Sequence, residues 1–220
     1  MTFYSGARYP SRVRLDGRYT SLEPLDATAH SDALFGATRG RGNDDLWRYL
    51  ADGPFDSADA FRQEIARKAV SADAVFLAIL DAARARSIGY ASYMRIEPAH
   101  GVIEVGNVLF SRELQGTTGA TEAMYLMARH AFENLGYRRY EWKCNALNSP
   151  SRAAALRLGF TFEGIFRQHM VIKGRNRDTA WFSMIDDEWP HLRAAFDRWL
   201  DPSNFDAQGR QRAALRSFRE

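Results

Sequence analysis

A stripe of small and apolar residues between residues 120 and 135 constrains the fold more than any other feature of the sequence. These residues recur at intervals of three and four, the spacing of one helix face; they are Ala120, Ala123, Met124, Met127, Ala128, Ala131, Phe132 and Leu135. One strand-like run precedes the stripe at 102–110, and another follows it at 139–144. A strand, a helix and a strand in this order predict a right-handed crossover between two parallel strands.

Further strands and helices are expected on both sides of this crossover. Apolar runs at 74–80, 88–96 and 102–110 are joined by short turns and predict an antiparallel meander. Additional strands are expected at 19–25, 160–172 and 179–185, and helices at 30–39, 57–70, 149–158 and 187–200. Ser57 is a suitable helix N-cap, and Gly136 and Gly159 are suitable C-caps. The sequence therefore predicts an α/β fold with a mixed sheet.

The length and residue usage limit the domain organisation and the compartment. We expect a mobile N-terminal arm at 1–17, a single domain at 18–200 and a polar C-terminal tail at 201–220 of the 220 residues. The longest apolar run, 74–80, is far shorter than the roughly 20 residues of a membrane helix. No secretory signal is visible at the N-terminus, so we expect a cytoplasmic protein with no membrane partner.

The reactive and charged residues exclude several classes of site. Cys144 is the single cysteine, which excludes an internal disulfide and a multi-cysteine zinc site, and it reads as a buried thiol. The five histidines lack metal-ligand spacing, so no metal is expected. The net charge of +3, from 30 basic and 27 acidic residues, does not by itself indicate a nucleic-acid partner.

The turn before the long helix contains the most informative local motif. It reads Gln115, Gly116, Thr117, Thr118, Gly119, Ala120, Thr121, and its small residues allow a ligand close to the backbone. Successive N–H groups at a helix N-terminus, together with the helix dipole, favour an anion such as pyrophosphate. The motif alone also fits an ordinary tight turn from strand to helix.

Two motifs together resemble the GNAT superfamily of N-acetyltransferases. The turn at 115–123 resembles the acetyl-CoA pyrophosphate loop of that family. The stretch 148–160, Asn-Ser-Pro-Ser-Arg-Ala-Ala-Ala-Leu-Arg-Leu-Gly-Phe, followed by Glu163, Gly164 and Arg167, looks like its RimJ/RimL-type branch. That branch acetylates ribosomal-protein N-termini or small amines. The resemblance implies a GNAT-like, mostly antiparallel sheet of six to seven strands with flanking helices and a central parallel β-α-β crossover.

The resemblance also implies a cofactor and its binding residues. The co-substrate is acetyl-CoA, and the residues expected to contact it are Phe110, Gln115, Gly116, Thr117, Thr118, Gly119, Ala120, Thr121, Asn148 and Ser151. Asn148 is expected to pair with the pantetheine arm. Two positions depart from the family pattern: Thr118 replaces a glycine, and Ala155 replaces the tyrosine that protonates the departing thiolate in many members. Thr118 keeps its N–H and could cap the helix.

The same resemblance suggests catalytic and acceptor-binding residues. Ser151 is the candidate to protonate the thiolate, although an ordinary first-turn serine fits the sequence as well. Glu104 is the first candidate for the base that takes the amine proton, and Glu141 is the second. A backbone N–H of Phe110 or Ser111 would stabilise the oxyanion. The acceptor is expected to contact Trp47, Tyr49, Pro54, Phe55 and Glu141, although core packing is an equal alternative for the aromatic residues.

Two other functions remain open from the sequence. A CoA-binding protein with weak or no catalysis would account for Ala155 and Thr118. An RNA-binding module would use Arg167, Lys173 and Arg175 with Arg177, but no row of aromatic residues accompanies them, so a nucleic-acid partner is not favoured. The expected partners are acetyl-CoA and an amine acceptor, and the protein is expected to be a monomer or a homodimer.

Overall fold

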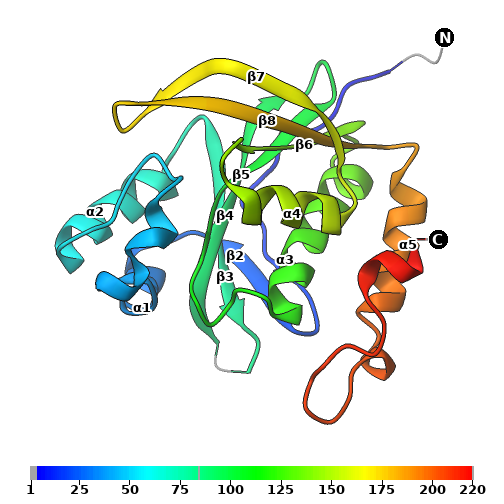
Figure 1. Cartoon of the computed structure of the whole chain (residues 1–220), viewed down its shortest axis with the longest axis horizontal. Helices are drawn as coiled ribbons and strands as arrows, with labels where there is room; N and C mark the ends of the chain where they lie inside the picture. Colours follow the sequence, from blue (N-terminus) through cyan, green and yellow to red (C-terminus); the bar gives the residue numbers. More distant parts are fainter. Residues whose placement is uncertain (1–3, 84, 220) are drawn as a thin grey trace.

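One sheet of eight strands, in the order β1-β2-β3-β4-β5-β6-β8-β7, forms the centre of the computed structural model, which describes residues 4–83 and 85–219 (Figure 1). The strands are β1 (Leu15–Asp16), β2 (Thr20–Pro24), β3 (Ala74–Asp81), β4 (Arg86–Glu97), β5 (Val102–Phe110), β6 (Arg139–Asn145), β7 (Thr161–Ile172) and β8 (Arg175–Ile185). Neighbours are antiparallel except for β5 and β6, which are parallel. The predicted meander and the predicted parallel crossover are therefore confirmed.

The structure adds detail to the predicted sheet. The seven expected strands are all present, and the short β1 is an eighth. Strand β8 begins at Arg175, four residues before its predicted start, because the turn from β7 needs only Lys173 and Gly174, with φ of 48° and 71°. The hairpin therefore extends further than its hydrophobic pattern suggests.

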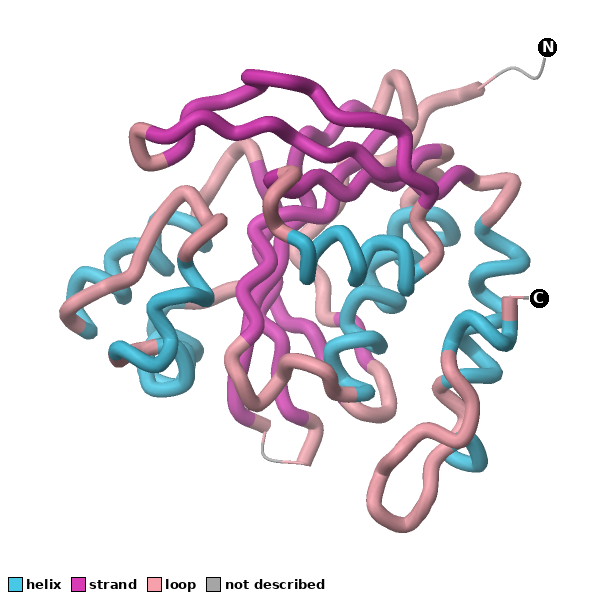
Figure 2. Tube along the Cα trace, in the orientation of Figure 1, coloured by secondary structure: helices cyan, strands magenta, loops and turns pink. Residues whose placement is uncertain are grey.

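Helices cover both faces of the sheet (Figure 2). On one side lie α1 (Ala27–Thr38), α2 (Ala58–Ala69) and the 3₁₀ helix η1 (Arg41–Trp47); on the other lie α3 (Thr118–Arg129), α4 (Ser149–Leu158) and α5 (Trp189–Trp199). Strand β3 shows why both faces are needed. Val75, Leu77 and Ile79 pack in the core that contains α3, whereas the alternate residues Phe76 and Leu80 pack in the core with α1 and α2.

Two of the predicted helix caps are confirmed by the structure. Ser57 caps α2 by accepting a hydrogen bond from the Ala60 N–H, and Gly159 ends α4 in a left-handed conformation with φ of 102°. The long apolar stripe forms α3 and then a π-helical turn, η2 (His130–Asn134). The methionines of this stripe, Met124 and Met127, are buried core residues.

The described segments before residue 18 and after residue 200 both contact the rest of the domain. In the segment before residue 18, the backbone N–H groups of Ala7 and Arg8 donate to the carbonyls of Pro98 and Leu135. After residue 200 come the 3₁₀ helices η3 (Pro202–Asn204) and η4 (Leu215–Phe218), and Leu215 is buried in the main core. None of the described helices combines the length and the apolar character that crossing a bilayer requires.

A buried carboxylate joins the start of the sheet to the crossover helix. Glu122 of α3 accepts hydrogen bonds from the backbone N–H groups of Arg18, Tyr19 and Thr20, at 2.9, 2.6 and 2.9 Å. Glycine is required beside it, because a Cβ on Gly17 would lie 2.5 Å from the Glu122 carboxyl carbon. This contact sets the position of α3 against the β1–β2 turn.

We predict that Glu122→Ala lowers the free energy of unfolding by about 3 kcal/mol, because it leaves one buried and two partly buried backbone donors without an acceptor. Glu122→Gln keeps one acceptor oxygen and should lose less. Urea unfolding followed by circular dichroism measures both. An alanine variant as stable as the parent would show that water replaces the carboxylate at this turn.

Candidate active site

Strands β5 and β6 pair over only part of their lengths. Residues 102–105 of β5 lie opposite 139–142 of β6, whereas β5 continues to Phe110 and β6 to Asn145. Beyond this point the two strands part. Because each parted strand keeps one edge without its parallel neighbour, backbone groups along that edge are available to pair with an extended ligand.

A bulge in β5 coincides with the parting. Tyr90 and Ser92 of β4 lie opposite Leu109 and Gly106 of β5, so β5 contains one extra residue in this stretch. Asn107, within the bulge, has a left-handed backbone with φ of 50°, and its side-chain amide donates to Ser92 Oγ at 3.0 Å. The bulge redirects β5 at the point where its pairing with β6 has ended.

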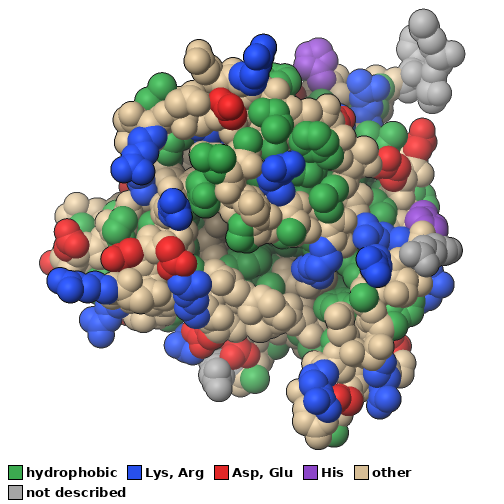
Figure 3. Space-filling view, viewed as in Figure 1, with side chains coloured by type: hydrophobic (Ala, Val, Ile, Leu, Met, Phe, Trp, Pro, Cys, Tyr) green, Lys and Arg blue, Asp and Glu red, His purple; other side chains and the backbone are tan. Residues whose placement is uncertain are grey.

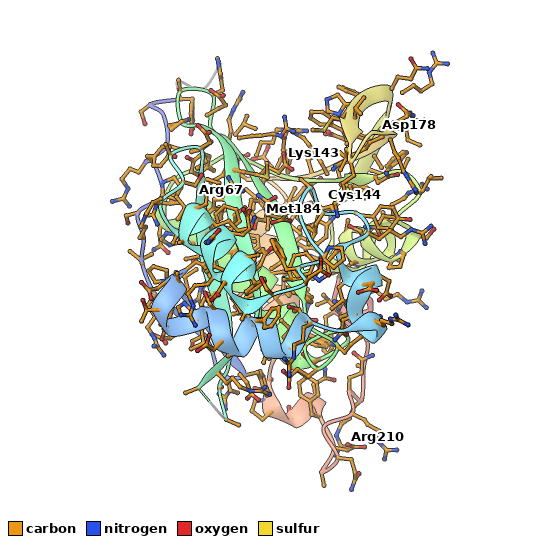
Figure 4. All side chains as sticks on the ribbon, turned by 90° about the vertical axis from the view of Figure 1, so that its left-hand side faces the viewer. Arg67, Lys143, Cys144, Asp178, Met184 and Arg210 are labelled. Carbon is orange, nitrogen blue, oxygen red and sulfur yellow. The ribbon has the colours of Figure 1, made fainter. Side chains whose placement is uncertain are left out.

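A cavity of about 1590 Å³ occupies the parted region and extends toward the C-terminal segment. This volume exceeds the roughly 300–1,000 Å³ of ordinary small-molecule sites, so it suits a long ligand or two substrates. Figure 4 shows Lys143 and Cys144 below the β7–β8 hairpin and Arg210 at the opposite end of the molecule. All three residues line the cavity, which therefore runs through much of the molecule.

The cavity wall is strongly cationic. Of its described residues, only Asp45 and Glu104 are acidic, whereas nine are basic: Arg48, Arg95, Arg112, Lys143, Arg157, Arg177, Arg210, Arg216 and Arg219. In the space-filling view, Lys and Arg side chains border the hollow between α4 and the C-terminal segment (Figure 3). This charge favours a ligand with several negative groups.

The start of α3 borders the cavity. Thr117, not Thr118, caps the helix: its hydroxyl accepts a hydrogen bond from the Ala120 N–H at 3.1 Å and donates to the Leu114 carbonyl. The other expected cofactor residues on the wall are Phe110, Gln115, Gly116, Thr118, Ala120 and Thr121. Gly119 is the exception, because its missing Cβ would face the Tyr19 carbonyl, 3.4 Å away.

Ser151 lies on the cavity wall with a directed hydrogen bond. The Trp142 indole N–H, which can only donate, contacts Ser151 Oγ at 3.0 Å. The serine oxygen is therefore the acceptor, and its own proton is left to donate to another group. Cys144 lies nearby; its burial raises the pKa of the thiol, an effect that the Ser151 hydroxyl opposes. The predicted buried thiol is confirmed.

Asn148 has a structural task besides any ligand contact. Its side-chain oxygen accepts a hydrogen bond from the Ser151 N–H at 3.2 Å and so caps α4. Asn148 also borders the cavity, which leaves its amide nitrogen as the group available to a ligand carbonyl. The cap fixes the first turn of α4, and with it the position of Ser151.

Glu104 is a buried carboxyl at the parting of the strands. Its side chain is 5 % exposed, and its Oε2 lies 2.8 Å from Arg95 Nε and 3.1 Å from Lys143 Nζ. Both nitrogens lie within ion-pair distance of this oxygen, so two cations flank the Glu104 carboxylate. Burial raises the pKa of Glu104 above its usual range, and the charges of Lys143 and Arg95 oppose the rise.

Lys143 connects Glu104 to Glu141. Its Nζ lies 2.6 Å from Glu141 Oε2 and 3.7 Å from the centre of the Trp181 ring, and its side chain is 4 % exposed. Glu141 in turn forms an ion pair with Arg139 and does not border the cavity. The structure therefore places Glu104, and not Glu141, where a substrate proton could reach a carboxylate.

The expected acceptor-binding residues separate into two groups. Tyr49 borders the cavity, and its hydroxyl donates to the Leu147 carbonyl at 3.2 Å. Trp47 and Phe55 instead pack edge-to-face in the core that contains α1 and α2, and they do not line the cavity. Aromatic side chains at these positions suggested a groove for the acceptor. In the structure, Trp47 and Phe55 instead hold α2 and the loop before it against the sheet. Sequence alone did not distinguish these two arrangements.

The expected oxyanion donor at Ser111 has another partner. Its backbone N–H donates to the Ile88 carbonyl at 3.1 Å, so this group is not available. The parted edge of β5, up to Phe110, is the remaining source of such a donor among the predicted residues.

The basic hairpin does not present a continuous cationic strip. Lys173 Nζ donates to the carbonyls of Trp47, Asp52 and Gly53, which ties the β7–β8 turn to the loop before α2. Arg177 borders the cavity instead. This placement gives no support to a nucleic-acid site at the hairpin.

Several residues that line the cavity were not predicted from the sequence. Arg95, Lys143 and Trp142 lie within strands, where no local pattern marks the residues that face a cavity. Arg157 belongs to the recognised 148–160 motif, and Arg219 to the segment that was considered only a polar tail. Their joint position depends on how the C-terminal segment folds back against α4.

Comparisons with known proteins agree with this geometry. Residues 21–161 match the acetyltransferase (GNAT) domain. The chain is similar to the crystal structure of a GCN5-related N-acetyltransferase from Brucella melitensis, with 45% identity, 98% coverage of both chains and a TM-score of 0.96. It is 42% identical to a GNAT-family structure from Chromobacterium violaceum, covering 86% of this chain and 94% of that one, with a TM-score of 0.80. It is also 31% identical to the ribosomal-protein-serine acetyltransferase of Escherichia coli over 100 residues, 46% of this chain and 55% of that protein.

Proposed function

The chain belongs to the GNAT acetyltransferase family and is an N-acetyltransferase, and on that premise we propose that it transfers the acetyl group of acetyl-CoA to a primary amine by direct attack. The acceptor class that we propose is a protein N-terminus or a small-molecule amine. The name of the Escherichia coli relative, a ribosomal-protein-serine acetyltransferase, favours a ribosomal protein as the acceptor. Direct attack is supported by the cavity, which is large enough to hold both substrates at once.

The observation that carries the proposal is the line of groups along the cavity. Glu104 at the parting of β5 and β6, Ser151 at the start of α4 and the start of α3 all border this one cavity. An extended pantetheine chain fits the parted strand edges, and a pyrophosphate fits the N-terminus of α3, where free N–H groups and the helix dipole favour an anion.

Each residue has a distinct role in the proposed reaction. Acetyl-CoA supplies an acyl group bound to a good leaving group, because a thiol has a pKa near 8.5. Glu104 takes the proton that the amine loses as its nitrogen bonds to the carbonyl carbon. Ser151, aligned by the Trp142 N–H, donates its proton to the sulfur as the carbon–sulfur bond breaks and regains one from solvent, to which Glu104 releases its own. Ser151 therefore occupies the role that Ala155, which is fully buried, cannot fill.

We predict that acetyl-CoA at about 100 times its dissociation constant stabilises the folded protein by roughly 2.7 kcal/mol, or about 5–10 °C in melting temperature. Thr118→Glu should erase this shift, because it places a negative charge at the phosphate position. The same substitution suits a helix N-terminus, so the unliganded protein should remain as stable as the parent.

Thr118→Gln is the matched neutral control and should retain most of the shift. Differential scanning fluorimetry measures all three proteins. An undiminished shift in Thr118→Glu would place the pyrophosphate elsewhere, and a parent protein without any shift would contradict acetyl-CoA binding.

Ser151→Ala should lower kcat by about 10²-fold and leave the KM for acetyl-CoA nearly unchanged, because the proton transfer matures only in the transition state. Pre-steady-state measurement of thiol release isolates the chemical step. Ser149→Ala, which alters an exposed residue of the same helix turn, is the control and should keep the parental kcat. A parental rate in Ser151→Ala would mean that the thiolate leaves unaided or takes its proton from water.

The pH profile tests Glu104 as the base. Because the carboxylate is the active form, kcat/KM should fall as pH drops through the raised pKa of Glu104, above the ordinary 4.5. Lys143→Met removes a nearby cation that favours the carboxylate, so the acid limb should move to higher pH. With the same acceptor, Glu104→Gln should lower kcat/KM by about 10²–10⁴-fold and lose this limb. Identical acid limbs in the parent and the Lys143→Met variant would exclude Glu104 as the titrating group.

A further inference from the structure

Two arginines of the cavity wall, Arg157 and Arg219, lie close together where the C-terminal segment contacts α4. Arg157 of α4 donates from Nη2 to Thr121 Oγ1 at 3.0 Å, and Arg219 donates from Nη1 to the Leu156 carbonyl at 3.2 Å. Both side chains line the cavity. Arg219 Nε is buried and has no hydrogen-bond partner among the described residues. These guanidinium groups therefore keep donors that the described protein does not use.

The electrostatics of this pair are unfavourable without an anion. Burial lowers the pKa of Arg157, and the positive charge of Arg219 lowers it further; burial also lowers the pKa of Arg219. Within residues 4–83 and 85–219, neither guanidinium has a carboxylate within 4.0 Å. Two partly desolvated like charges cost stability, and a bound phosphate would compensate both, because a guanidinium matches phosphate geometry.

Specific contacts hold the C-terminal segment in this position. The Arg219 carbonyl contacts His191 Nε2 of α5 at 2.8 Å, and the Asn204 side-chain amide donates to the carbonyls of Trp199 and Ala213. Leu215 is buried in the main core. The Arg219 guanidinium is therefore presented by packed structure, and its alignment with Arg157 is a feature of the fold.

The contact of Arg157 with the first turns of α3 points to the phosphate next to the pyrophosphate. Thr121, the partner of Arg157, belongs to the first turns of α3, whose N-terminus is the proposed pyrophosphate site. Glu104 lies on β5 and Ser151 in the first turn of α4, whereas Arg157 lies near the end of α4 and Arg219 in the C-terminal segment that contacts α4 and α5. In acetyl-CoA the thioester, the pyrophosphate and the phosphorylated ribose follow one another in this order.

We propose that Arg157 and Arg219, with Arg216 at the rim of the cavity, bind the 3′-phosphate on the ribose of acetyl-CoA. This inference rests on the proposed use of acetyl-CoA and adds a residue set that makes the protein select CoA over its dephosphorylated form. It also gives the C-terminal segment a function in substrate recognition.

The test compares two ligands, CoA and 3′-dephospho-CoA, by isothermal titration calorimetry. The parent protein should bind CoA about tenfold to hundredfold more tightly, as charge-assisted hydrogen bonds to one phosphate predict. The Arg157→Ala, Arg219→Ala double variant should bind the two ligands within about threefold of one another. Its affinity for 3′-dephospho-CoA should match that of the parent, which also shows that the variant is folded.

Arg212→Ala is the matched control, since Arg212 belongs to the same segment, is exposed and does not line the cavity. This variant should keep the parental preference for CoA. Equal affinity of the parent for both ligands overturns the inference. A double variant that weakens both ligands equally overturns it as well, because the arginines would then serve the pyrophosphate. A parent that binds neither ligand contradicts the acetyl-CoA proposal itself.

Discussion

The early end of the β5–β6 pairing is the constraint on which the rest of the site depends. Parallel strands joined by a helix normally pair along their shared length, but here the pairing stops after residue 105 of β5, and an extra residue at Asn107 bends the strand. The opening exposes strand edges in the interior of the protein. Because α3 is the next element after β5 and α4 is the next after β6, both helix N-termini lie beside this opening.

Charge is distributed along the cavity according to the chemistry that each part would perform. Near the opening, Lys143 contacts both Glu104 and Glu141, so the buried charges there largely compensate one another. The low dielectric of this region still favours the neutral form of Glu104, a property suited to a group that accepts a proton. Arg157 and Arg219, in contrast, have no carboxylate within 4.0 Å among residues 4–83 and 85–219. A single cavity thus combines a balanced reactive end and a cationic anchoring end.

Hydrogen bonds from neighbouring side chains orient the reactive groups. Asn148 caps α4 through the Ser151 N–H, while the Trp142 indole N–H fixes the Ser151 hydroxyl oxygen. The motif that resembles the GNAT family therefore has a local structural meaning here, because the same asparagine starts the helix and orients its serine. Thr117 performs the corresponding cap at α3, which leaves the Thr118 backbone at the cavity wall.

The sequence by itself determined the elements that depend on local spacing: the meander, the crossover helix, the caps at Ser57 and Gly159, and the two motifs that indicate the family. Only the tertiary structure decided which residues line the cavity. Trp47 and Tyr49 are two residues apart in the sequence, yet Trp47 lies in the core and Tyr49 lines the cavity. Arg157 and Arg219 are 62 positions apart in the sequence, yet both line the same cavity. The physical reason is that periodicity reports which face of an element is buried, whereas a site is formed where distant elements part or pack, and no local pattern encodes that arrangement.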